Sequence, residues 1–156
     1  MIISKKNILT KSFNLFQVVL IILFSSELFA QDIIEFSEKN KQWTIDECVN
    51  EFNLNDTIGT NVGYQYWFFN KDFIDGRTLK MSVAAPHSVT HSPHKHSEDE
   101  FFFVLEGKAE FYLDGKTIEG DKYSAFYCPR YSEHGIRNVG DTELKYLVIK
   151  KYESIK

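Results

Sequence analysis

The sequence predicts an all-β fold, an antiparallel sandwich or a small barrel, built from a single domain of a 156-residue chain. Apolar segments recur at intervals of roughly ten residues, with Gly, Asp or Pro at the joints between them. Aromatic residues make up 15% of the chain, including 14 Phe and 8 Tyr, and such side chains favour strands. No segment has the apolar period of a long helix, which excludes a helical bundle.

Each expected element follows from its local pattern. Residues 44–52 can form a short helix, because Thr44 can cap it and Glu47 follows three positions later. Residues 53–63 are rich in turn formers and are expected to be a loop. Asp72–Gly76 is a turn, and Pro86 ends the second strand. The expected strands are residues 63–69, 78–85, 101–107, 109–115, 116–121, 124–129, 134–141 and 143–152.

The N-terminal 30 residues have the pattern of a secretory signal peptide. Three lysines precede an apolar stretch over residues 16–24, and the small residue Ala30 precedes Gln31. The apolar stretch is shorter than the roughly 20 residues of a membrane span. The alternative is an uncleaved N-terminal anchor. We therefore expect a signal peptide over 1–30, a leader over 31–62, a barrel domain over 63–156, and export to the periplasm, with no membrane attachment after cleavage.

The charge of the chain limits its partners. Without residues 1–30, which hold three lysines and one glutamate, the chain keeps 15 basic and 21 acidic residues. A net negative protein is a poor ligand for nucleic acid or for an anionic membrane surface. An anionic small molecule stays a candidate partner, because a local pocket can be positive inside an acidic protein.

Cys48 and Cys128 are the only cysteines. An exported protein could join them in a disulfide. Two buried free thiols are the alternative, since a free cysteine packs as a small apolar side chain.

Four side chains have the chemistry and the phase of a metal site. His94 and His96 are two residues apart, so on an extended strand they face the same side. Glu100 follows in the same phase, at the start of an apolar strand. If a second hairpin brings His134 to them, three imidazoles and one carboxylate meet. That donor set suits one divalent ion of Zn, Mn, Fe, Ni or Co.

The spacing of these residues resembles the two signatures of the cupin superfamily. His94-x-His96-x3-Glu100-x6-Gly107 is similar to the first signature, and Pro129-x4-His134-x3-Asn138 to the second. The resemblance covers about residues 79–149 and implies a double-stranded β-helix, or jelly roll, with one metal held by His94, His96, Glu100 and His134. Ser88 and Tyr131 stand where the family usually has Gly, and three extra residues separate Gly120 from Pro129.

The neighbouring polar residues are expected to play lesser roles. Asn138 is expected to serve a turn or to support a ligand. His87 and His91 have no place in the motif and are read as loop residues near the mouth. Glu98 and Asp99 are expected to form a solvated acidic edge. The strand after Glu100 is apolar on both faces, which predicts a second packing layer or a dimer contact.

The wider pattern is similar to small cupins that process unsaturated uronic-acid sugars, among them a ring-opening type and a dehydratase type. This resemblance implies a metal-dependent lyase, a dehydratase acting on unsaturated uronic-acid oligosaccharides in polysaccharide breakdown. Tyr127 and Tyr131 are the predicted catalytic residues, and Lys80 and Arg130 the predicted substrate-binding residues. The alternatives are an Fe(II) dioxygenase and a non-catalytic carbohydrate-binding cupin. A small acidic sugar is the expected partner, and a homodimer is an expected assembly.

Overall fold

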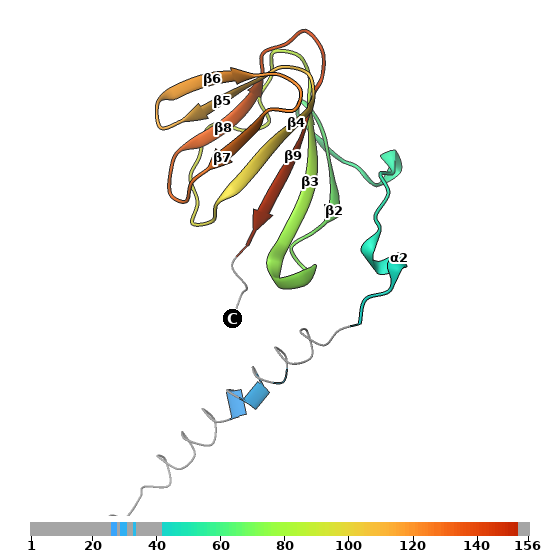
Figure 1. The fold of residues 1–156 in the computed structure, drawn as a ribbon. Coiled ribbons are helices and arrows are strands. Elements are labelled where there is room, and N and C mark those ends of the chain that lie inside the picture. Colours follow the sequence, from blue (N-terminus) through green and yellow to red (C-terminus); the bar gives the residue numbers. More distant parts are fainter. Residues whose placement is uncertain (1–25, 28, 31–32, 34–41, 153–156) are drawn as a thin grey trace, which may run out of the picture. The chain divides into compact units, whose positions relative to one another are not determined.

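The computed structural model describes residues 26–27, 29–30, 33 and 42–152 (Figure 1). Most of the signal peptide expected over residues 1–30, and residues 31–32 and 34–41 of the leader expected over 31–62, thus lie outside the described residues. The chain divides into two units, residues 1–44 and residues 45–156. No helix among the described residues is long and apolar enough to cross a membrane.

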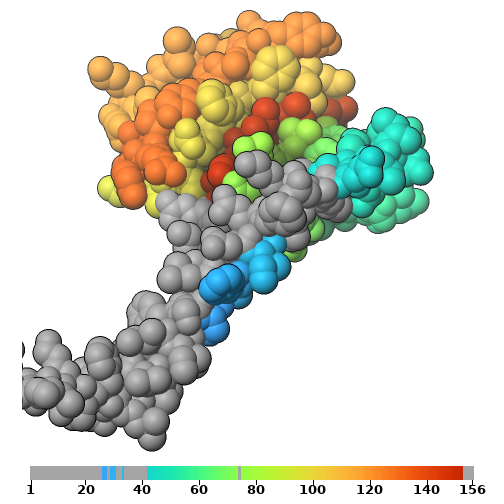
Figure 2. All heavy atoms as spheres, turned by 60° about the horizontal axis from the view of Figure 1, so that its bottom comes forward, coloured from blue at the N-terminus to red at the C-terminus, as the bar shows by residue number. Residues whose placement is uncertain are grey.

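The second unit consists of two antiparallel sheets, which confirms the predicted all-β fold (Figure 1). The larger sheet has the strand order β1-β2-β3-β9-β4-β7, and the smaller has the order β6-β5-β8. In the space-filling view, the red atoms of β9 lie between the green atoms of β3 and the yellow atoms of β4 (Figure 2). The strands are β1 Ile58–Thr60, β2 Gly63–Phe69, β3 Arg77–Ala84, β4 Glu100–Glu106, β5 Ala109–Leu113, β6 Lys116–Gly120, β7 Ala125–Cys128, β8 His134–Asn138 and β9 Leu144–Lys151.

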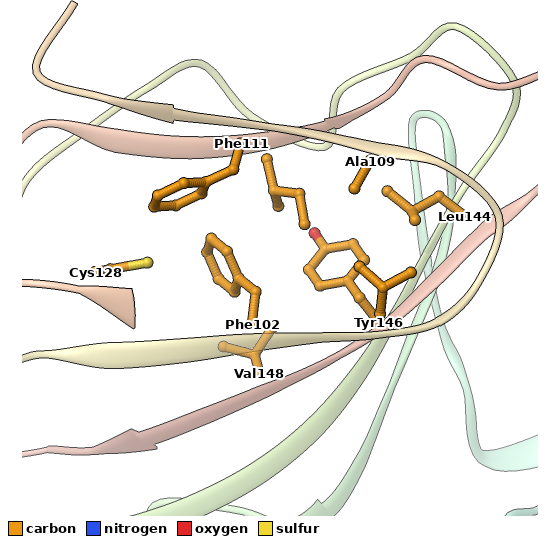
Figure 3. Packing of buried hydrophobic residues seen from close by; sticks show 9 residues of the cluster. Phe102, Ala109, Phe111, Cys128, Leu144, Tyr146 and Val148 are labelled. Atoms are coloured by element: carbon orange, nitrogen blue, oxygen red, sulfur yellow. The ribbon is translucent and has the colours of Figure 1, made fainter. Parts of the chain in front are cut away.

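The core lies between the two sheets, because each sheet turns every second side chain toward the other. Phe102 and Tyr146 come from the larger sheet and Phe111 and Ile136 from the smaller, and all four are buried. Figure 3 shows the labelled aromatic rings meeting in this space, with Cys128 at its edge. Cys128 and the exposed Cys48 are both free thiols, so the structure contains no bridge between them.

A second apolar cluster covers the outer face of the larger sheet. Tyr66, Met81 and Val83 are buried there. Phe52 packs edge-on against Tyr66, with ring centroids 5.1 Å apart. The Tyr66 hydroxyl lies 2.8 Å from both Asn50 Oδ1 and Glu51 O, and its proton can serve one acceptor at a time. The segment before β1 therefore packs on the outer face of β2, whereas Phe101 on the outer face of β4 is exposed.

Two local expectations were wrong. Residues 58–60 were expected to be loop, but they form β1 and pair with the start of β2, Thr60 opposite Gly63. All three residues of β1 are exposed, so this edge strand has no apolar alternation to reveal it. The helix expected over 44–52 is reduced to α2 (Ile45–Cys48). Residues 50–52 leave the helix because they pack on Tyr66, and two 3₁₀ turns, η1 (Leu54–Asp56) and η2 (Ile74–Gly76), complete the elements.

Candidate metal centre

The fold brings together the four side chains that the sequence predicts as ligands. His94 and His96 lie in the loop between β3 and β4, Glu100 is the first residue of β4, and His134 is the first residue of β8. An isolated antiparallel bridge joins His94 to His134, through backbone hydrogen bonds of 3.0 and 2.9 Å. The loop that carries two histidines is therefore fixed to the strand that carries the third, and the two sheets meet at this point.

One potential ligand atom from each of the four residues lies within 4.8 Å of every other. Glu100 Oε1 is 3.1 Å from His134 Nε2, and Glu100 Oε2 is 3.7 Å from His96 Nε2. Glu100 and His134 are buried, and His94 and His96 are half-buried. This cluster of three imidazoles and one carboxylate is consistent with a divalent metal site.

Hydrogen bonds at Nδ1 of two histidines orient the Nε2 atom of each ring toward the position of a metal ion. His96 Nδ1 lies 2.7 Å from the carbonyl oxygen of Glu98, and His134 Nδ1 lies 2.9 Å from that of Ser132. A carbonyl only accepts, so both Nδ1 atoms carry a proton, and Nε2 is the atom of each ring that a metal ion would bind. This arrangement is the usual support of a metal-binding imidazole.

Two buried nitrogens in the cluster have no hydrogen-bond partner, His94 Nδ1 and His96 Nε2. Buried polar atoms are almost always paired, so two orphans in one cluster fit a site that a further ligand completes. Burial also lowers the pKa of His94, with smaller contributions in the same direction from His91 and His134. A lowered pKa favours the neutral imidazole, which is the form that binds metal.

Two lysines stand beside the cluster. Lys150 on β9 is opposite Glu100 in the strand register, and its Nζ lies 4.0 Å from Glu100 Oε2 and 3.7 Å from Glu98 Oε2. Its side chain is only 9% exposed. Lys80 on β3 faces the same interior, because it pairs with Val148 of the core. Burial lowers the pKa of Lys80, against a smaller opposing effect of Glu100.

Lys150 was missed in the sequence although a signal for it exists. Tyr146, Val148 and Lys150 alternate along β9, so they share one face, and the first two are buried. A lysine in phase with buried side chains therefore points into the barrel. Glu98 was expected on a solvated edge, which is wrong. Its side chain is 16% exposed and lies near both Lys150 and His96.

The structure turns the side chain of Tyr127 away from the cluster and leaves that of Tyr131 exposed next to the loop of His96. Tyr127 pairs with Phe101 while its neighbour Cys128 pairs with Glu100, so Tyr127 lies on the opposite face of the sheet. Its hydroxyl donates to Asp99 Oδ2 over 3.3 Å. Tyr131 is 68% exposed. Arg130 is exposed as well, so of the two predicted substrate-binding residues only Lys80 lies in the barrel interior.

The other motif residues have structural roles. Asn138 is buried, and its Nδ2 lies within 3.0 Å of the carbonyl oxygens of Ala84, Ala85 and Thr142. Its Oδ1 accepts from Gly140 N–H, which confirms the predicted turn role. His87 is an exposed loop residue that contacts Asp141. His91 is also exposed, with its ring centroid 4.5 Å from that of His94.

Comparison with known proteins agrees with this geometry. A family model described as a cupin domain matches residues 80–150, the range that holds all four clustered residues and both lysines. This match identifies residues 80–150 as a cupin domain. An uncharacterized protein of Methanocaldococcus jannaschii is 36% identical over 55 residues, which are 35% of this chain and 44% of that protein. The chain thus matches less than half the length of this relative.

Solved cupin-like structures share the fold at low identity. A predicted oxalate decarboxylase of Thermotoga maritima has a TM-score of 0.53 and 23% identity, over 56% of this chain and 78% of that one. A polyketide cyclase of Streptomyces resistomycificus has a TM-score of 0.55 and 21% identity, over 66% and 79%. A protein of Photorhabdus luminescens has a TM-score of 0.58 and 15% identity, over 70% and 89%. The predicted cupin jelly roll is confirmed, and these likenesses show the fold alone.

Proposed function

We propose that this cupin is a metal-dependent lyase, a dehydratase that acts on unsaturated uronic-acid oligosaccharides. The observation that carries the proposal is the cluster of His94, His96, Glu100 and His134, in which two buried nitrogens lack a partner. A bound divalent ion would act as a Lewis acid on a carbonyl or carboxylate of the substrate. The uronide preference comes from the resemblance seen in the sequence, and the charges around the cluster support an acidic substrate.

Lys80 and Lys150 are the residues that would hold the substrate carboxylate. Both are largely withdrawn from solvent, and the carboxylates of Glu98 and Glu100 balance their charges in the absence of a metal. Adding a divalent cation to this set leaves an excess of positive charge in a poorly solvated place. Buried charge is costly unless it is paired, so the loaded site favours an anionic ligand.

An Fe(II) dioxygenase is the second candidate. The observation in its favour is the same donor set, since imidazole and carboxylate ligands also suit Fe(II). The structural neighbours do not choose between the candidates, because those named above include a cyclase and a predicted decarboxylase. A non-catalytic carbohydrate-binding cupin would bind its sugar at the same cluster without turnover.

The test is turnover on a panel of lyase-generated unsaturated oligouronides, with and without a chelator. We expect a product with the mass of the substrate minus water, lost on chelation and in His134→Ala but kept in His87→Ala. Oxygen uptake is followed in the same samples. If the protein contains bound metal but forms no product from any sugar of the panel, the lyase proposal is refuted. Oxygen consumption without loss of water would favour the dioxygenase.

Lys150→Met tests how the carboxylate is held. The substitution keeps much of the side-chain length and removes the charge, so we expect KM to rise about tenfold or more, since a hydrogen bond to a charged group is worth about 1.5–3 kcal/mol. Metal content should not change. Lys151→Met is the matched control, because Lys151 pairs with Asp75 on the surface. An equal rise of KM in both variants would show that the Lys150 charge does not contact the substrate.

A further inference from the structure

A pocket of about 490 Å³ lies at the end of the barrel where β2 and β9 finish. Its lining is Trp67, Asn70, Lys71, Asp72 and Tyr152. The volume is in the range of small-molecule sites, roughly 300–1,000 Å³. Two aromatic rings beside a few polar groups are the surroundings in which a sugar ring stacks and hydrogen-bonds.

The two aromatic walls of the pocket contact the two lysines that stand beside the metal cluster. Lys150 Nζ lies 4.7 Å from the centre of the Tyr152 ring and 4.0 Å from Glu100 Oε2, so that ring centre is at most 8.7 Å from the carboxylate. Trp67 lies beside the second lysine in the same way, since Lys80 Nζ is 5.1 Å from the centre of the Trp67 ring. Each lysine beside the metal cluster thus also lies over one aromatic wall of the pocket.

The walls are fixed by the fold. Trp67 is opposite Lys80 in the β2–β3 register, so both face the barrel interior. Tyr152 follows Lys150 by two residues, and its backbone N–H donates to the carbonyl of Gly76 over 2.9 Å. Asn70 Oδ1 accepts from Asp72 N–H, so the Asn70 amide NH₂ is the group that could donate to a ligand hydroxyl.

From this arrangement we infer that the pocket is a subsite for the second ring of an acidic oligosaccharide, whose terminal ring occupies the metal centre. The inference rests on the proposed acidic-sugar function and adds a length preference to it. Trp67 and Tyr152 stack on the second ring, while Asn70 and Asp72 bind its hydroxyls. The protein therefore binds a disaccharide or a longer chain more tightly than a monosaccharide.

The chain offers a direct reporter for this subsite. Trp67 is one of only two tryptophans, so Trp43→Phe leaves it as the only one. The probes are galacturonate and saturated digalacturonate, which lack the unsaturated bond of the proposed substrates. Affinity is measured by calorimetry on the full chain, and Trp67 fluorescence is measured in the Trp43→Phe background.

We expect digalacturonate to bind about tenfold more tightly than galacturonate, the size of one aromatic stacking contact, and to change the Trp67 emission. Tyr152→Ala and Tyr152→Leu should remove the difference, whereas Tyr123→Ala should keep it, because Tyr123 is an exposed residue outside the pocket lining. Equal affinity for the two sugars in the unsubstituted protein would overturn the subsite, and so would a preference that survives both Tyr152 variants. If the protein binds digalacturonate more tightly than galacturonate but does not turn over unsaturated sugars, the lyase proposal is refuted and the subsite is supported.

Discussion

At the scale of single residues, the surroundings of a histidine decide whether it belongs to the candidate metal centre. The chain has five histidines, and three of them converge with Glu100. His134 is fully buried and contacts Glu100, whereas His87 is exposed and contacts Asp141. The same side chain is therefore a candidate metal ligand at His134 and a solvent-exposed loop residue at His87.

The first prediction concerns these two histidines. His134→Ala should lose most of the bound metal, because it removes one of four donors and typical ligand sets are intolerant of such a loss. His87→Ala should keep the full content. Metal analysis of purified protein after dialysis checks both, and unchanged metal content in His134→Ala would show that the ligand set is wrong.

Tyr131 is a residue whose backbone explains a departure from the family pattern. It stands where the cupin signature usually has Gly, and its φ of 62° lies in the left-handed region that favours glycine. The Tyr131 N–H donates to the carbonyl of His96 over 2.9 Å, so the bend helps to hold a ligand loop. The side chain itself is exposed and takes no part in the core.

From this geometry, Tyr131→Gly should raise the free energy of unfolding by about 0.5 kcal/mol. Relief of the left-handed strain is worth roughly 1–2 kcal/mol, and the greater entropy of glycine in the unfolded chain offsets part of it. Urea denaturation measures the change. Ser132→Gly is the control, because φ is not positive at Ser132 and only the entropy cost remains. Loss of stability in Tyr131→Gly equal to that of the control would contradict the strain argument.

At the scale of elements, the larger sheet is covered on its inner face and on part of its outer face. Its inner face packs on the smaller sheet, and the β2–β3 part of its outer face packs on residues 50–52, while Phe101 and Ile149 stay exposed. The strand β4 shows why, since Phe102 and Val104 are core residues while Leu105 joins the outer cluster. The short segment before β1 is therefore part of the folded domain rather than a tether.

Removal of one hydroxyl tests this contact. Tyr66→Phe should lower the free energy of unfolding by about 1 kcal/mol, because it leaves the buried ring in place and deletes the hydrogen bond that the hydroxyl donates to Asn50 or Glu51. Tyr123→Phe, at an exposed position, should stay within about 0.5 kcal/mol of the unsubstituted protein. Denaturant unfolding compares the two. Equal stability of both variants would mean that the segment before β1 contributes little to the fold.

At the scale of the whole molecule, we propose that the protein is exported and processed. Basic residues, an apolar stretch and Ala30 form the pattern that carries this proposal. Expression of the full sequence in a Gram-negative host should give a periplasmic protein that begins at Gln31, as found by intact mass and N-terminal sequencing. A full-length chain in the membrane fraction would instead support the uncleaved anchor.

Much of the fold and the site could be predicted from the sequence, because both depend on local periodicity. Alternation gave β2 and β3 close to their observed bounds, and the phase of His94, His96 and Glu100 placed them together. The strand β1 could not be predicted, since its exposed residues carry no apolar pattern. Tyr127 was predicted at the site from its nearness in sequence, but nearness does not determine which face of a strand a side chain takes.

The sequence by itself determined the class of fold and the four-residue cluster, because turn residues, strand period and ligand spacing are properties of neighbouring positions. Only the tertiary structure decided which further groups surround that cluster. Lys150 reaches Glu100 because β9 pairs with β4, and Lys80 lies alongside because β3 pairs with β9. Strand order joins residues up to 74 positions apart, as Arg77 and Lys151 are, and no local pattern encodes that order. The charges around the cluster therefore follow from the pairing of strands, while the candidate metal donors follow from the spacing of residues.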